Sequence, residues 1–94
     1  MIIKICGIQD ENTLLCCEKN NIDFFGMIFY AKSPRNISFE NAKILQKISK
    51  KLKINGVGVF VNKNINELVD ITKRVRLKYV QLHGSENEEY IKTL

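Results

Sequence analysis

Polar and reactive residues lie at or just beyond the ends of the apolar stretches of this sequence, some of them next to a glycine. These positions are Cys6, Gly7, Arg35, Asn62, His83 and Gly84. Thiols and imidazoles can transfer protons, and a guanidinium can donate two parallel hydrogen bonds to a planar carboxylate. If these residues came together, they would make an acid-base site for a small anionic molecule.

Each of these residues also has a purely structural interpretation. A free cysteine at a strand end often only fills a core, and a lone histidine there is more often a hydrogen-bonded structural residue. Arg35 follows Ser33 and Pro34, and an arginine in such a loop is commonly solvated. The residues taken singly leave both interpretations open.

The apolar stretches alternate with segments of helical character. Strands are predicted at residues 2–6, 23–30, 54–61 and 78–82, and helices at 10–20, 38–52 and 64–75, with another helix beginning in 85–94. Asp10 and Ser38 are candidate N-caps. Segment 38–52 repeats apolar residues at helical spacing and carries lysines in its last turns, where they suit the helix dipole.

This alternation predicts an α/β fold with a parallel sheet. Uniformly apolar strands of this kind are expected to be buried on both faces under right-handed helical crossovers. Two architectures fit: a doubly wound open sheet, and part of a (β/α)8 barrel, which needs more than about 200 residues. In both, the candidate residues lie at the carboxyl ends of the strands, where binding and catalysis are concentrated.

The net charge of +5 comes from 15 Lys+Arg and 10 Asp+Glu. The lysines are scattered, apart from the cluster Lys47, Lys50, Lys51 and Lys53. No aromatic and arginine residues interleave beside that cluster, so we expect a solvated surface and no nucleic-acid partner. No apolar run reaches 18 residues and no signal peptide is evident, so we expect no membrane partner.

Three cysteines occur without metal-ligand spacing. This pattern predicts free thiols in a reducing compartment, hence a cytoplasmic protein without a metal site. Cys16 and Cys17 stand in the middle of a predicted helix, with one of them facing the sheet, and we interpret both as structural.

Four motifs, in order, resemble one enzyme family. KICGI at 4–8, FYAKSPR at 29–35, GVFVN at 58–62 and VQLHG at 80–84 are similar to phosphoribosylanthranilate isomerase of tryptophan biosynthesis. Members of that family are complete (β/α)8 barrels. The resemblance therefore implies that residues 1–94 are the N-terminal half of a single (β/α)8 domain, a parallel (βα)4 half-barrel truncated in its fourth helix.

The resemblance also implies an activity and its residues. The family converts its substrate by an Amadori rearrangement, which needs an acid at the ring oxygen and a base at C2. By resemblance Cys6 is the base, Gly7 lets the chain turn and the substrate approach, and Arg35 binds the anthranilate carboxylate. His83 and Gln81 are implied as further substrate-binding residues, and no cofactor is implied.

The resemblance places other parts of the site outside these residues. The family's general acid follows the fifth strand, and its phosphate is held after the seventh and eighth strands. We therefore expect this chain to be inactive alone, and to self-associate or pair with a C-terminal half-barrel. The alternatives are a non-catalytic α/β domain that binds ligands or nucleic acid and a thiol redox protein. The sequence has no glycine-rich phosphate loop, which disfavours the first alternative, and no C-x-x-C motif, which disfavours the second.

Overall fold

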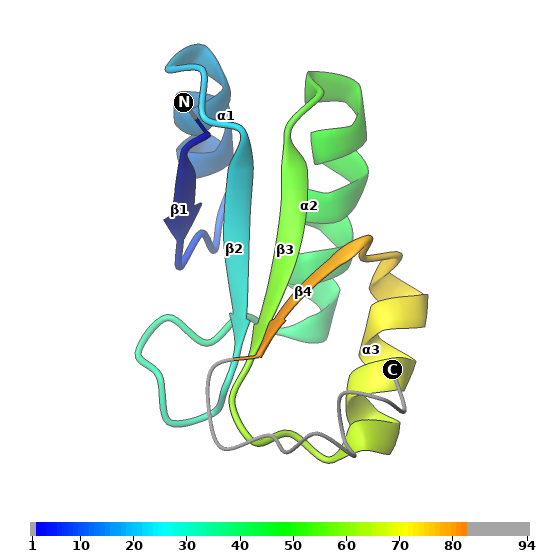
Figure 1. Ribbon diagram of the computed structural model, residues 1–94. Coiled ribbons are helices and arrows are strands. Elements are labelled where there is room, and N and C mark those ends of the chain that lie inside the picture. The colour runs from blue at the N-terminus through cyan, green and yellow to red at the C-terminus, as the bar shows by residue number, and fades with distance from the viewer. Residues whose placement is uncertain (1, 83–94) are drawn as a thin grey trace.

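The computed structural model describes residues 2–82. Strands alternate with helices along these residues (Figure 1): β1 Lys4–Cys6, α1 Glu11–Lys19, β2 Phe24–Phe29, α2 Phe39–Leu52, β3 Asn55–Phe60, α3 Ile65–Val75 and β4 Tyr79–Leu82. The predicted alternation is confirmed, and each strand is slightly shorter than predicted. The helix expected to begin in 85–94 lies outside the described residues.

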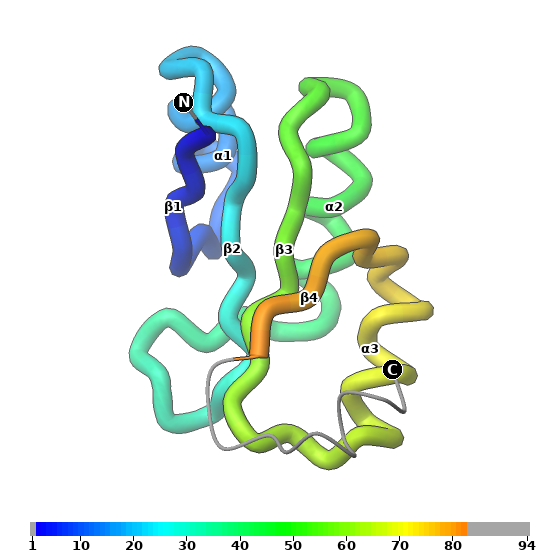
Figure 2. The backbone as a smooth tube through the Cα atoms, in the orientation of Figure 1, coloured from blue at the N-terminus to red at the C-terminus, as the bar shows by residue number. Residues whose placement is uncertain are grey.

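The strands form one parallel sheet in the order β1-β2-β3-β4. Each helix returns the chain to the amino end of the next strand, and the described helices lie along the same face of the sheet (Figures 1 and 2). Crossovers of one hand put helices on both faces only when the strand order reverses. The unreversed order of the four described strands is the order of a half-barrel and argues against the doubly wound alternative.

The predicted helix starts carry side-chain caps. Asp10 Oδ1 accepts a hydrogen bond from the Thr13 backbone N–H at 2.8 Å, and Ser38 Oγ accepts one from the Asn41 N–H at 3.1 Å. Asn64 caps α3 in the same manner. Each cap pairs a backbone donor that would otherwise have no partner inside its helix. Capping therefore sets where each helix starts relative to the strand before it.

The hydrophobic core lies between the sheet and the helices. Phe25 and Met27 project from β2 into it and are fully buried. They meet Leu14 of α1, Leu45 of α2 and Leu68 of α3, all buried as well. Side chains of a strand alternate between the two faces. Phe24, Gly26 and Ile28 of β2 therefore face away from this core.

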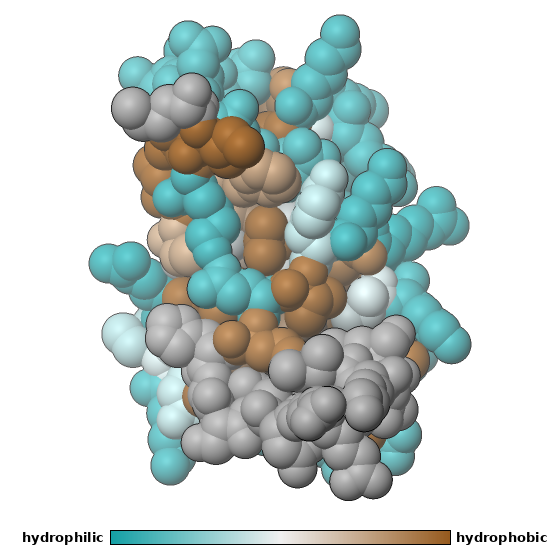
Figure 3. All heavy atoms as spheres, in the orientation of Figure 1, coloured by the Kyte–Doolittle hydropathy of each residue, from teal (hydrophilic) through white to brown (hydrophobic). Residues whose placement is uncertain are grey.

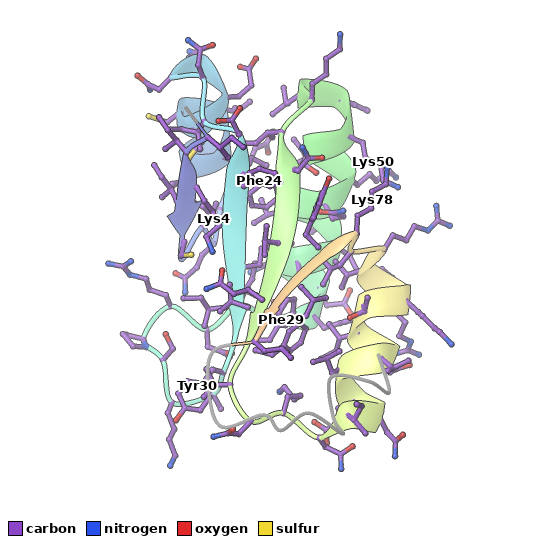
Figure 4. All side chains as sticks on the ribbon, viewed as in Figure 1. Lys4, Phe24, Phe29, Tyr30, Lys50 and Lys78 are labelled. Atoms are coloured by element: carbon purple, nitrogen blue, oxygen red, sulfur yellow. The ribbon has the colours of Figure 1, made fainter. Side chains whose placement is uncertain are left out.

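The opposite face of the sheet carries no second layer of described residues. Phe24 of β2 and Tyr79 of β4 meet edge-on above β3, with ring centroids 5.3 Å apart. Because β3 separates these strands, the contact shows that the sheet curls toward this side. We call it the open face; Figure 3 shows apolar side chains on the strand side of the molecule, and Figure 4 labels Phe24 there.

The prediction that the strands are buried on both faces is confirmed only for part of the sheet. In the central strand β3, residues 56–60 are buried on both faces. The prediction is wrong for β1 and β4, where Ile5 and Tyr79 remain 41% and 45% exposed. These are the edge strands, and an edge strand lacks a neighbour to cover one of its sides.

We expect Ser38→Ala to lower the free energy of unfolding by about 1 kcal/mol, because the Asn41 N–H loses its partner at the start of α2. Urea unfolding followed by circular dichroism would measure this. Asn41→Ala is the matched control, because it keeps the backbone donor and changes only an exposed side chain. Equal destabilisation by both substitutions would contradict the capping role.

Candidate functional site

The thiol of Cys6 lies on the open face at the carboxyl end of β1. Cys6 pairs in register with Gly26 of β2, and position 26 faces away from the core because its neighbours Phe25 and Met27 face into it. A Cβ built on Gly26 would lie 2.8 Å from Cys6 Sγ. The sulfur therefore occupies space that any side chain at position 26 would fill, and Cys6 is half-buried.

A tight turn follows the thiol. Gly7 has φ +85°, a backbone conformation that residues with a Cβ adopt at a cost. The N–H groups of Gly7 and Ile8 both donate to the Gly26 carbonyl, at 3.0 and 3.1 Å. The backbone after Cys6 is thus fixed to the strand that leaves room for its sulfur.

The Arg35 side chain lies over this turn. A Cβ built on Gly7 would collide with Arg35 Cδ and would lie 3.1 Å from Nη1. Gly7 therefore gives space both to the turn and to the aliphatic part and guanidinium of Arg35. The motifs at 4–8 and 29–35 meet here, and the structure brings Arg35 beside Gly7, the residue that follows Cys6.

Short hydrogen bonds fold the loop between β2 and α2. The Ser33 N–H donates to the Tyr30 carbonyl at 3.0 Å, and Ser33 Oγ accepts from the Arg35 N–H at 3.1 Å. The Ile37 N–H then donates to the Ile28 carbonyl at 2.8 Å. The loop is thereby turned back onto β2, which holds Arg35 at the rim although its side chain is exposed.

A further contact joins this loop to the loop after β1. Gln9 Nε2 donates to the Asn36 carbonyl at 3.3 Å. Gln9 is two residues after Gly7 in the sequence, and Asn36 directly follows Arg35. This hydrogen bond limits how far the two loops can separate.

The remaining predicted residues are less closely associated with this site. Gln81 is half-buried on the open face, opposite Val59 in register. Asn62 follows β3 with φ +48°. His83 lies outside the described residues. The structure thus joins Cys6, Gly7 and Arg35, and places Gln81 on the same face of a more distant strand.

Of the other two cysteines, one faces the sheet, as the sequence predicts. Both are free; Cys17 is buried toward the sheet and Cys16 is exposed. Burial, and to a smaller extent the neighbouring Cys16, raises the pKa of the Cys17 thiol. Within residues 2–82, no group of His, Cys, Asp and Glu side chains could hold a metal ion, and no helix is long and apolar enough to cross a membrane.

Two residues of the site were not predicted from sequence. Gly26 interrupts the apolar stretch FFGMIF, and a glycine inside a strand is a known sign of close approach by another group. Gln9 gave no comparable signal, because its contact depends on how the loops after β1 and β2 meet in space.

The sequence profile described as "N-(5'phosphoribosyl)anthranilate (PRA) isomerase" matches residues 3–94. The chain belongs to this family. A relative from Clostridium acetobutylicum, named N-(5'-phosphoribosyl)anthranilate isomerase, is 43% identical over 94 residues, which covers 98% of this chain and 44% of that protein. This chain thus spans less than half the length of that isomerase.

Solved structures of the family share the fold of this chain. Phosphoribosyl anthranilate isomerase from Thermotoga maritima matches with a TM-score of 0.92 at 36% identity, covering 99% of this chain and 45% of that one. A family structure in complex with reduced 1-(o-carboxyphenylamino)-1-deoxyribulose 5-phosphate matches with a TM-score of 0.91, also at 36% identity, over 99% of this chain and 48% of that chain. The parallel sheet corresponds to the N-terminal (βα)4 part of the TIM barrel of the isomerase family.

We expect Gly7→Ala to lower the free energy of unfolding by about 1 to 2 kcal/mol, because the left-handed backbone is strained for alanine. The new Cβ also displaces Arg35, so part of the loss should disappear in an Arg35→Ala background. Urea unfolding of the two single variants and the double variant measures this coupling, which we expect to be at least about 0.5 kcal/mol. Strict additivity would show that Arg35 does not lie over Gly7.

Proposed function

We propose that this chain is the thiol-bearing half of an N-(5'-phosphoribosyl)anthranilate isomerase of tryptophan biosynthesis. The observation that carries the proposal is the contact of Arg35 with the turn at Gly7, directly after the half-buried thiol of Cys6. It puts a cation that can bind a carboxylate beside a potential base, in a chain of the isomerase family.

The reaction needs two proton transfers. An acid protonates the ring oxygen of the ribosylamine, the ring opens, and a Schiff base forms between the sugar C1 and the anthranilate nitrogen. A base then removes the proton from C2, and the resulting enolamine becomes the 1-deoxyribulose 5-phosphate. We assign the base to Cys6, since its sulfur lies on the open face and the absent Cβ of Gly26 leaves space around it.

Arg35 is assigned to the anthranilate carboxylate. Its guanidinium can donate two parallel hydrogen bonds to a planar carboxylate, and its place over Gly7 would hold the aromatic end of the substrate near the thiol. The ligand in the related complex carries a carboxyphenylamino group and a sugar phosphate. That ligand supports a small phosphosugar carrying an aromatic acid as the substrate. Gln81 and His83 stay in the proposal as substrate-binding residues.

The proposal requires a second half-barrel. Residues 1–94 correspond to about 45% of the solved family chains, and we assign them to the N-terminal half of a single (β/α)8 domain. The general acid and the phosphate site would come from the other half, which would cover the open face and pair with the edge strands β1 and β4. The exposed side chains Ile3, Ile5 and Tyr79 support such a partner, either a C-terminal half-barrel or a second copy.

The same proposal includes a reducing, cytoplasmic setting. All three cysteines of the sequence fall within the described residues and are free. A base that acts as a thiolate has to stay reduced, and reducing compartments keep thiols in that form.

We expect residues 1–94 to turn over phosphoribosylanthranilate only when mixed with a C-terminal half-barrel from a relative. Cys6→Ala should then lower kcat by about 10² to 10⁴, the usual contribution of a general base. Fluorescence-monitored turnover measures both effects, and Cys16→Ala is the control, because that thiol is exposed on α1. Full activity of the Cys6 variant in the mixture would sink the assignment of the base.

In the same mixture, Arg35→Lys should lower kcat/KM by about 10 to 100-fold, because a lysine cannot form the bidentate pair with the carboxylate. The loss should appear mainly in KM, since the carboxylate does not change during the reaction. Lys32→Gln, which removes an exposed charge from the same loop, should leave both constants nearly unchanged. A similar loss in both variants would point to general attraction of anions instead.

A further inference from the structure

Cations of α2 and of the end of α3 gather along a groove far from the thiol. One hollow of about 380 Å³ is lined by five of them: Lys43, Lys47, Lys50, Arg74 and Arg76. An adjoining hollow of about 410 Å³ shares Lys50 and adds Lys53 and Lys78. We call the two hollows the basic groove; no acidic side chain is among the described residues that line it.

The tertiary structure joins three lysines of the cluster at 47–53 to cations that lie elsewhere in the sequence. Lys43, Lys47 and Lys50 follow one another at helical spacing on one side of α2. The helix dipole favours cations in the last turn of a helix, which accounts for Lys50. It does not account for Lys43 and Lys47, which precede that turn, nor for Lys78, which lies beyond α3. Figure 4 shows Lys50 of α2 and Lys78, which precedes β4, near each other at the hollow that both line.

The base of the groove is held in place by Gln46. This side chain is only 7% exposed, lines both hollows, and donates a hydrogen bond from Nε2 to the Arg76 carbonyl at 3.0 Å. Arg76 ends α3 in a left-handed conformation, with φ +64°. The hydrogen bond ties the middle of α2 to the end of α3, so the two walls of the groove are fixed before any ligand arrives.

Two cations at one end of the groove contact an aromatic ring. Lys43 Nζ and Arg74 Cζ lie 5.3 and 5.4 Å from the centroid of Phe39, within the range of cation–π attraction. Arg74 also faces Asp70 at 3.6 Å, but both side chains are 62% exposed, so that pair is largely screened by water.

A hollow lined by charges of one sign raises the local concentration of the opposite ion.

From this arrangement we propose that the basic groove binds a linear polyphosphate. Lys43 to Lys50 extends about 10 Å along α2, so positive charge is spread along a line, which suits a chain of several phosphates better than a single phosphate. Single-stranded nucleic acid would need free aromatic faces for its bases. Here Phe39 already contacts two cations and Tyr79 packs against Phe24. The phosphates could be those of inorganic polyphosphate or of a nucleotide tail.

Titration with inorganic tripolyphosphate, followed by amide NMR shifts of the chain at low salt, tests this proposal. We expect saturable shifts at α2 and at the end of α3, with little change at Cys6. Lys47→Gln with Lys50→Gln should weaken binding roughly tenfold, since each exposed ion pair contributes up to about fivefold. Lys19→Gln with Lys51→Gln removes the same charge from helix positions outside the groove and should weaken it much less.

Two further ligands, adenosine triphosphate and a single-stranded oligonucleotide, distinguish the possible sources of the phosphates. Similar affinity for tripolyphosphate and adenosine triphosphate would support recognition of the phosphate chain alone, whereas much tighter binding of the nucleotide would support a nucleotide tail. Three results would overturn the proposal. They are equal weakening by the two double variants, absence of saturable shifts, and stronger binding of a single-stranded oligonucleotide with the same number of phosphates.

Discussion

The helices of this chain cover one face of its parallel sheet, and the rest of the structure depends on that one-sided cover. Because side chains alternate along a strand, each strand sends one set into the core and another to the open face. Phe25 and Met27 form the core with the helices, while Cys6, Phe24 and Gln81 lie on the other side. Burial of the helix-facing set fixes the register, and the register in turn decides which residues can meet the thiol.

Absent side chains are as important to the candidate site as the reactive ones. Gly26 leaves the space that the Cys6 sulfur occupies, and Gly7 leaves the space that Arg35 crosses. The carbonyl of Gly26 also accepts the two N–H groups that follow the thiol. The Cys6 sulfur and the Arg35 side chain therefore both lie in space that the missing Cβ atoms of Gly26 and Gly7 leave open.

The two ends of the strands carry different chemistry. Cys6 lies at the carboxyl end of β1 and Arg35 in the loop after β2, at the same edge of the sheet. The segments that lead into β3 and β4 carry Lys53 and Lys78 of the basic groove. Since α2 is about 20 Å long, charges at its far end are screened from the thiol at physiological salt. An anion in the groove would thus have little electrostatic effect on the thiol.

The sequence by itself determined the order of strands and helices, the caps at Asp10 and Ser38, and the placement of Cys6 at the end of a strand and of Arg35 beyond one. These features are local, because they depend on apolar periodicity and on hydrogen bonds between residues close in the chain. Only the tertiary structure decided that Gly26 makes room for the sulfur, that Gln9 reaches Asn36, and that cations of α2, of the end of α3 and of the segment before β4 line one groove. Those contacts join segments far apart in sequence, and they exist only once the helices have packed on one face and set the register of the sheet.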